Sequence, residues 1–181
     1  MSDDTFGSIM QSLDARMIVV TAAAGAERAG CLVGFHAQSS IDPQRYTVWL
    51  SKANHTYRVA LRSTHVGVHF LTADDVSLAT RFGTLSGDDI DKFAGLGVRV
   101  ADGGVPLLAE SPHWMLLRRT ALLDEGGDHV CVAGQAVAAR TDGAFQPLRL
   151  SHVSHLTAGH STDERPAPPT ERADHDPAGD V

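Results

Sequence analysis

The chain has 181 residues, of which 43% are hydrophobic, so it is long enough to bury one large core and we expect a single domain. Its formal net charge is -7 and it contains no basic run, which argues against a nucleic acid or an anionic membrane surface as partner and favours a small molecule. No apolar stretch reaches the roughly 18 residues of a membrane helix, and no basic, apolar leader precedes Met17. We therefore expect a cytoplasmic protein.

In chain order, seven segments combine strand-forming residues with turn signals at their ends. They are residues 16–23, 30–41, 45–51, 66–71, 97–100, 114–125 and 129–140. Short helices are expected at 5–14, 54–63, 75–83 and 88–93. Because the strands do not alternate regularly with helices, the pattern predicts a mainly β fold, a mostly antiparallel, Greek-key-like barrel with a few short helices. We expect the domain to span residues 1–160 and the Pro-rich, charged segment 161–181 to be a disordered tail.

The segment 30–41 has the sequence GCLVGFHAQSSI, whose side chains alternate between two faces if it is extended. One face is expected in the core: Cys31, Val33, Phe35, Ala37 and Ile41. The other face carries small and hydrogen-bonding residues: Gly30, Leu32, Gly34, His36, Gln38 and Ser40. Small residues allow a close approach to the backbone, and polar groups suit the edge of a flat ligand. This second face is therefore either a pocket wall or a solvent-facing strand edge.

The next feature is a helix start within SKANHTYRVALR. Asn54 can cap the helix, whose apolar stripe is Ala53, Tyr57, Ala60 and Leu61. Lys52, the hydroxyl groups of Ser51 and Thr56 and the free amides of the first turn could together hold a phosphate. The alternative is a capped surface helix without a ligand.

His129 begins the last predicted strand and shares a face with Cys131, while Val130 and Val132 point the other way. Both faces are apolar, so this strand should be covered twice, by its own core and by a second layer, a helix or a partner subunit. His129 would then lie at the edge of a covered region. The apolar surroundings of Cys31 and Cys131 predict buried free thiols, although a disulfide between the two stays open.

Other histidines offer incomplete metal-ligand patterns. His65 and His69 lie four residues apart on one face of a predicted strand, and His152, His155 and His160 cluster near the end of the domain. Neither set has a carboxylate or cysteine close in sequence to complete it. We interpret these histidines as structural or solvent-exposed and predict no metal site.

Several motifs, taken in order, resemble those of the flavin reductase-like, FMN-binding split-barrel family. They are GCLVGFHAQSSIDP, SKANHT, SLATRFG, DKF, GVPLL, GDHVCVAGQAV and PLRLSHVSHL. The resemblance spans residues 15–156, nearly the whole of the expected domain. The most specific part is Gly-Asp-His before an apolar strand, preceded by Asp-Lys-Phe and Gly-x-Pro-Leu-Leu.

The resemblance implies a homodimer that binds FMN or FAD, uses NAD(P)H as co-substrate and often supplies a partner monooxygenase. It places the isoalloxazine ring against the backbone of Phe35, His36, Ala37, Gln38, Ser39 and Ser40. It places the flavin phosphate at Lys52, Asn54, His55 and Thr56, and Phe82 of SLATRFG completes the cofactor-binding set. His129 would be the catalytic residue, close to where the nicotinamide stacks on the flavin.

Two other functions stay open at this stage. The protein could be a flavin-dependent oxidoreductase acting on its own organic substrate, or a flavin-binding protein without enzymatic activity. For His129, the alternative is a histidine that caps a strand end against the Asp128 carboxylate.

Overall fold

The computed structural model describes residues 3–159, so the predicted tail at 161–181 and His160 lie outside the described residues. The described strands are β1 (Ile18–Ala24), β2 (Glu27–Val33), β3 (His36–Ser40), β4 (Arg45–Ser51), β5 (His65–Phe70), β6 (Val98–Val100), β7 (Pro106–Leu108), β8 (Trp114–Leu123) and β9 (His129–Arg140). The described helices are α1 (Asp3–Leu13), α2 (His55–Ala60), α3 (Val76–Thr84), α4 (Leu150–Val153) and a 3-10 turn at Asp102–Gly104.

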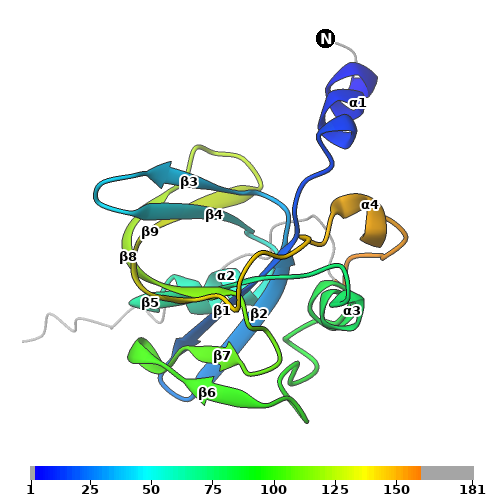
Figure 1. Ribbon diagram of the computed structural model, residues 1–181. Coiled ribbons are helices and arrows are strands. Elements are labelled where there is room, and N and C mark those ends of the chain that lie inside the picture. Colours follow the sequence, from blue (N-terminus) through cyan, green and yellow to red (C-terminus); the bar gives the residue numbers. More distant parts are fainter. Residues whose placement is uncertain (1–2, 160–181) are drawn as a thin grey trace, which may run out of the picture.

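Seven strands form one antiparallel sheet in the order β2-β1-β5-β8-β9-β4-β3, and β6 pairs with β7 in a separate hairpin. Strands joined by short turns pair as neighbours, β1 with β2, β3 with β4 and β8 with β9. The large sheet curls into a half-barrel, with the β3–β4 hairpin above β1, β2 and β5 in the view of Figure 1. The expected mainly antiparallel β fold with a few short helices is confirmed.

The first core cluster fills the half-barrel. It joins side chains from β1, β2, β4, β5, β8 and β9 to the buried face of α2, which contributes Val59 and Ala60. Leu50 and Val132 are fully buried there, on strands that pair directly. Burying one such aliphatic side chain contributes about 1.5–3 kcal/mol, so this cluster holds α2 firmly against the sheet.

The second core cluster lies on the other face of β1. Val19 belongs to this cluster, together with buried side chains of α3 and α4 and with Phe93 and Leu108. The residues that flank Val19, Ile18 and Val20, belong to the first cluster. A strand covered on both faces reads as a continuous apolar run, which explains why β1 shows no polar alternation.

The predicted strand 30–41 is interrupted at Gly34 and Phe35, so it forms β2 and β3 rather than one strand. Cys31 and Val33 are buried as expected, but Phe35 is 59% exposed and Ile41 is 82% exposed. The single core face that we expected is therefore wrong beyond Val33. The break changes the direction of the chain, so the alternation of side chains along β2 does not continue into β3.

The segment 88–93 was expected to be a helix and instead forms turns. Lys92 extends into the protein, is 5% exposed, and donates hydrogen bonds to the carbonyl oxygens of Gly30 and Phe82, each at 3.0 Å. Burial lowers the pKa of Lys92. The Asp-Lys-Phe motif thus anchors this turn to β2 and α3. The short strand β7, within GVPLL, was also not expected.

The helix α1 stands away from the half-barrel, at the top of Figure 1. Its hydrophobic side chains recur at the spacing of one helical face and are largely exposed: Phe6, Ile9, Met10 and Leu13. No helix within residues 3–159 combines the length and the apolar character needed to cross a membrane.

Candidate functional site

The end of β2 and the start of β9 enclose a pocket of about 350 Å3, which we call the Phe35–His129 pocket. Its lining residues are Ala15, Met17, Cys31, Leu32, Val33, Gly34, Phe35, Trp49, Ser51, Asn54, Asp128, His129 and Leu150. Most of these are apolar, and three are aromatic or imidazole rings. A pocket of this size with apolar walls and a few polar groups is typical of sites for small planar ligands.

Strand register brings the two sides of this pocket together. In the β4–β9 pair, Ser51 lies opposite His129 and Trp49 lies opposite Cys131. The chain break after β2 positions Phe35, whose carbonyl accepts a hydrogen bond from the Trp49 amide at 2.9 Å. As a result, the Phe35 and His129 rings lie 5.1 Å apart between centroids, inclined at 59°.

The imidazole of His129 is oriented by its neighbour. Its Nδ1 lies 2.8 Å from Oδ1 of Asp128, and this hydrogen bond holds the pKa of the Asp128 carboxyl below its usual value. With Nδ1 engaged, Nε2 is the ring nitrogen left for a ligand. The structure therefore contains the contact between His129 and the Asp128 carboxylate that we considered as an alternative role for His129. His129 also lines the pocket, so the two interpretations are compatible.

At the base of the pocket, Asn54 caps α2. Its side-chain oxygen accepts a hydrogen bond from the Thr56 amide at 3.0 Å, as the sequence predicted. The Thr56 hydroxyl is buried and hydrogen-bonds with the Cys31 thiol, whose pKa is raised by burial. The thiols of Cys31 and Cys131 are both free and buried, as expected from their apolar surroundings.

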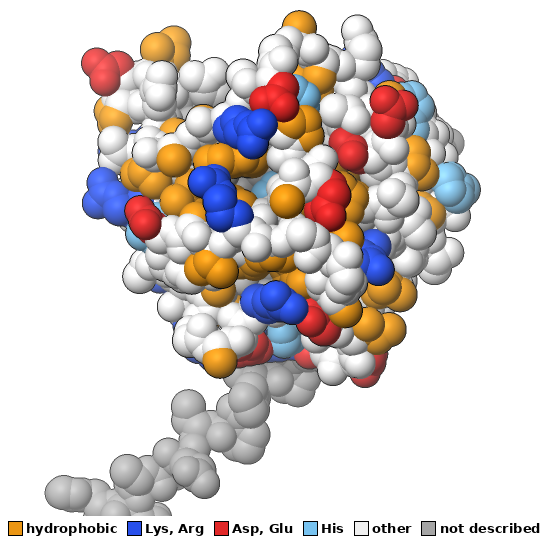
Figure 2. Space-filling model, turned by 60° about the horizontal axis from the view of Figure 1, so that its bottom comes forward, with side chains coloured by type: hydrophobic (Ala, Val, Ile, Leu, Met, Phe, Trp, Pro, Cys, Tyr) orange, Lys and Arg blue, Asp and Glu red, His pale blue; other side chains and the backbone are white. Residues whose placement is uncertain are grey.

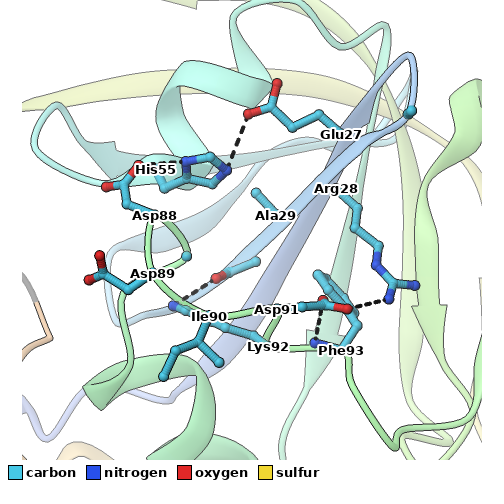
Figure 3. Close-up of a pocket in the computed structure, with 13 residues that line it drawn as sticks. Glu27, Arg28, Ala29, His55, Asp88, Asp89, Ile90, Asp91, Lys92 and Phe93 are labelled. Carbon is cyan, nitrogen blue, oxygen red and sulfur yellow. Dashed lines mark hydrogen bonds and ion pairs between the residues drawn. The ribbon is translucent and has the colours of Figure 1, made fainter.

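A second and larger pocket of about 430 Å3, the Glu27–His55 pocket, is lined by residues of β2, by His55 at the start of α2 and by the segment 87–93 (Figure 3). His55 is held between two carboxylates, with Nε2 3.3 Å from Glu27 and Nδ1 2.9 Å from Asp88. Burial acts to raise the pKa of Asp88, but hydrogen bonds from Arg58 and His55 outweigh it and lower the pKa. The charged groups of this pocket are thus already paired with one another. The Phe35–His129 pocket is smaller but more apolar, and we therefore consider it the better site for a planar ligand.

Comparison of the sequence with models of known protein families identifies the family of this chain. A family model described as flavin reductase-like domain matches residues 10–157. The chain belongs to this family. Its half-barrel is accordingly the split barrel of flavin reductases, and the recognition made from the sequence motifs is confirmed.

Among curated proteins, the chain is 30% identical over 148 residues to the FMN reductase (NADH) SmoA of Agrobacterium fabrum, covering 81% of each chain. Among solved structures, it resembles nitrilotriacetate monooxygenase component B of Mycobacterium thermoresistibile, with a TM-score of 0.72, 22% identity, and 94% and 93% of the two chains covered. It also resembles the NADH:FAD oxidoreductase of Streptomyces globisporus, with a TM-score of 0.73, 19% identity, and 93% and 95% covered. At these identities the structural likenesses show the fold alone. The chain spans about half (51%) of a further structural relative, an oxidoreductase from Sinorhizobium meliloti.

The structure brings together three of the residues that the resemblance implicated. Phe35, Asn54 and His129 all line the Phe35–His129 pocket. Phe82 lies just beyond it, in an adjoining cavity of about 190 Å3 that shares Asn54, and packs edge-on against Phe93 at 5.4 Å.

The remaining residues of the flavin-family set lie elsewhere. His36 faces a separate groove, where its ring nitrogens contact the Tyr46 hydroxyl at 2.6 Å and the Arg16 carbonyl at 2.8 Å. The other predicted residues of β3 lie along its edge, and three of them are exposed: Ala37, Gln38, Ser39 and Ser40. Lys52 pairs with Asp124 at 3.0 Å, next to the β8–β9 turn.

Sequence reasoning missed Trp49 and the apolar floor formed by Met17 and Leu150. Trp49 alternates with Ser51 along β4, so strand periodicity could have placed both on one face. Met17 and Leu150 are far apart in sequence and meet because the Met17 amide donates a hydrogen bond to the Leu148 carbonyl at 2.8 Å. No pattern of neighbouring residues in the sequence indicates this contact between two distant segments. Among residues 3–159, no group of three His, Cys, Asp or Glu residues is placed to hold a metal ion.

Proposed function

We propose that the protein is an NAD(P)H-dependent flavin reductase that binds FMN or FAD in the Phe35–His129 pocket. The observation that carries this proposal is the convergence of Phe35, Trp49 and His129 on one apolar pocket at the end of β2. Aromatic walls suit a planar ring system, and Gly34 between β2 and β3 leaves backbone accessible at the pocket edge. Family membership supports the same ligand class.

A bound flavin supplies the redox chemistry, accepting a hydride from the nicotinamide. The protein's own residues position the rings and compensate charge. Phe35 and Trp49 offer aromatic rings against which the flavin would pack, and Ser51 offers a hydroxyl group in the pocket wall. His129, held by Asp128, can present an imidazolium to the negative charge that a reduced flavin carries.

For the phosphate we propose Lys52 together with the capped start of α2. Ser51 and Asn54 line the pocket on either side of Lys52 in sequence, which supports this placement. The Lys52 ammonium is mostly covered, and its partner Asp124 is half exposed, so an incoming phosphate could replace that carboxylate. His55 and Thr56, although predicted from the same segment, face Asp88 and Cys31 respectively.

The direct test measures flavin binding and NAD(P)H oxidation separately. Wild-type protein should bind added FMN or FAD with quenching of flavin fluorescence and should oxidise NADH or NADPH in air. We expect His129→Ala to lower the oxidation rate about ten- to hundredfold with a smaller change in flavin Kd, and Phe35→Ala to weaken flavin binding. His155→Ala, at an exposed histidine outside the pocket, is the matched control. A wild-type protein that binds flavin but shows no flavin-stimulated nicotinamide oxidation would instead be a non-enzymatic flavin carrier.

The phosphate assignment has its own pair of variants. Lys52→Met should weaken flavin binding, whereas Asp124→Asn, which removes the competing carboxylate, should leave it unchanged or tighter. An unchanged dissociation constant in Lys52→Met would place the phosphate elsewhere.

We also propose a cytoplasmic homodimer that supplies reduced flavin to a monooxygenase. Free buried thiols support the compartment. The exposed apolar face of α1 supports self-association, because an isolated helix of 11 residues is marginal in water without a packing partner. Sedimentation of the wild type and of Ile9→Asp tests the dimer: the variant should shift toward monomer. A relative named as a monooxygenase component supports the coupling, which a reconstituted hydroxylation assay would test.

A further inference from the structure

Another cavity lies away from the proposed flavin site, between the β6–β7 hairpin and the start of β8. This Arg99–Arg140 pocket has a volume of about 220 Å3 and is lined by Arg99, Leu107, Leu108, Ala109, Ser111, Trp114 and Arg140. It shares no lining residue with the Phe35–His129 pocket or the Glu27–His55 pocket. In Figure 1 the β6–β7 hairpin is at the bottom of the molecule, and Figure 2 shows that side, where basic side chains stand among hydrophobic ones.

Strand pairing brings Arg99 and Arg140 to the wall of one pocket together with Trp114. Trp114 and Arg140 are direct partners in the β8–β9 pair, so their side chains project from the same face of the sheet. Arg99, on β6 opposite Leu107, places its guanidinium carbon 4.8 Å from the centre of the Trp114 ring. Stacking occupies the flat face of the Arg99 guanidinium and leaves its N–H edges available to a ligand.

The pocket also contains a buried hydroxyl group without a partner. Ser111 is 2% exposed, and its Oγ makes no hydrogen bond within the described part of the chain. A buried polar atom left unpaired costs about 1–3 kcal/mol, so native proteins usually pair such groups. Ser111 lines the same pocket as Arg99 and Arg140, which points to an acceptor atom of a ligand as its missing partner.

Positive charge in the pocket is only partly compensated. Arg140 pairs with Asp142 at 3.1 Å, but both side chains are more than half exposed, so this contact contributes little. Within residues 3–159, Arg99 has no carboxylate at ion-pair distance. The nearby Glu110 does not line the pocket, and its carboxylate accepts a hydrogen bond from the Gly97 amide at 3.0 Å.

We propose that the Arg99–Arg140 pocket binds a small carboxylic acid with an apolar body. The carboxylate would accept hydrogen bonds from the two guanidinium groups and from the Ser111 hydroxyl, a donor set that matches its two oxygens. The apolar body would lie against Leu107, Leu108 and Ala109, which supply the hydrophobic part of the wall. Inorganic phosphate has the charge but no apolar body to place against this wall, and a whole nucleotide exceeds the volume. The site therefore accepts an organic acid in addition to the proposed flavin and nicotinamide.

The test titrates sodium benzoate into the full chain by isothermal calorimetry and follows the fluorescence of its two tryptophans, of which only Trp114 lines this pocket. We expect one saturable site, weakened about tenfold or more by Arg99→Gln and by Arg140→Gln. Ser111→Ala should also weaken benzoate binding without lowering Tm, because it removes an unpaired hydroxyl, whereas a purely structural serine would affect Tm instead.

Two variants serve as controls. Arg118→Gln changes an exposed arginine of the same β8–β9 pair that hydrogen-bonds to Gln135 and does not line the pocket, so benzoate affinity should be unchanged. Phe35→Ala should also bind benzoate normally, which separates this site from the proposed flavin site. The proposal is overturned if benzoate shows no saturable binding, if its affinity is the same in Arg99→Gln and Arg140→Gln, or if inorganic phosphate binds and benzoate does not.

Discussion

Mild acid should destabilise the protein through His69, an imidazole that is fully buried on β5. Its Nε2 lies 3.4 Å from the Thr21 hydroxyl on the neighbouring strand. Burial lowers the pKa of His69 from 6.5 to about 3, although the Pro106 carbonyl oxygen, as a hydrogen-bond acceptor for the imidazole, acts to raise it. The folded protein therefore keeps this side chain neutral well below the pH at which the unfolded chain protonates it.

The sign and the size of the effect follow from proton binding. Between pH 6.5 and about 3 the unfolded chain binds a proton that the folded protein does not, so the free energy of unfolding falls as the pH falls. The slope is about 1.4 kcal/mol per pH unit inside that window. From about pH 7.5 to about pH 5, His69 alone should remove about 2 kcal/mol from the free energy of unfolding.

Urea unfolding at these two pH values, followed by tryptophan fluorescence, measures the loss. In His69→Leu the loss between the two pH values should be about 2 kcal/mol smaller than in the wild type, whatever the stability of the variant at neutral pH. Burial also lowers the pKa of His36. His36 is present in the wild type and in His69→Leu, so its contribution to the loss cancels in the comparison. Thr21→Val removes the hydrogen-bond partner but no titrating group, so it should keep the wild-type pH dependence. An equal loss in the wild type and His69→Leu would refute the reasoning.

Three further predictions concern stability and reactivity. Asn54→Ala should lower the free energy of unfolding by about 1 kcal/mol, measured in urea, because the cap on α2 is lost. Gly30→Ala should cost about 1–3 kcal/mol in the same assay, since a Cβ there would lie 2.7 Å from a ring carbon of the buried Phe82; no change would mean that the ring can move aside. Burial raises the pKa of Cys31 and of Cys131, so iodoacetamide should label neither thiol in the native protein and both in urea, as read by mass spectrometry; rapid native labelling of Cys31 would contradict its burial.

Local patterns were sufficient where a segment's structure depends on its own residues. The cap at Asn54 was predicted because an amide side chain needs only the two amides that follow it. The strand β9 was predicted with its exact bounds, 129–140, because its apolar run is long and bounded by glycines and a charged end. The helix expected at 88–93 was wrong because the structure of this segment depends on distant residues: Lys92 is inserted between the carbonyl groups of Gly30 and Phe82.

By itself, the sequence determined the fold class, the family and the position of most strands, since alternation, turn residues and ordered motifs are local properties. Only the tertiary structure decided which side chains share a pocket. The break between Gly34 and Phe35 turned one predicted ligand-binding segment into two, so Phe35 faces His129 while His36 faces Tyr46. Likewise, Arg99 and Arg140 line one pocket only because two separate strand pairs, β6–β7 and β8–β9, lie next to each other there. Such meetings depend on register and on the curl of the sheet, which arise from contacts between residues far apart along the chain.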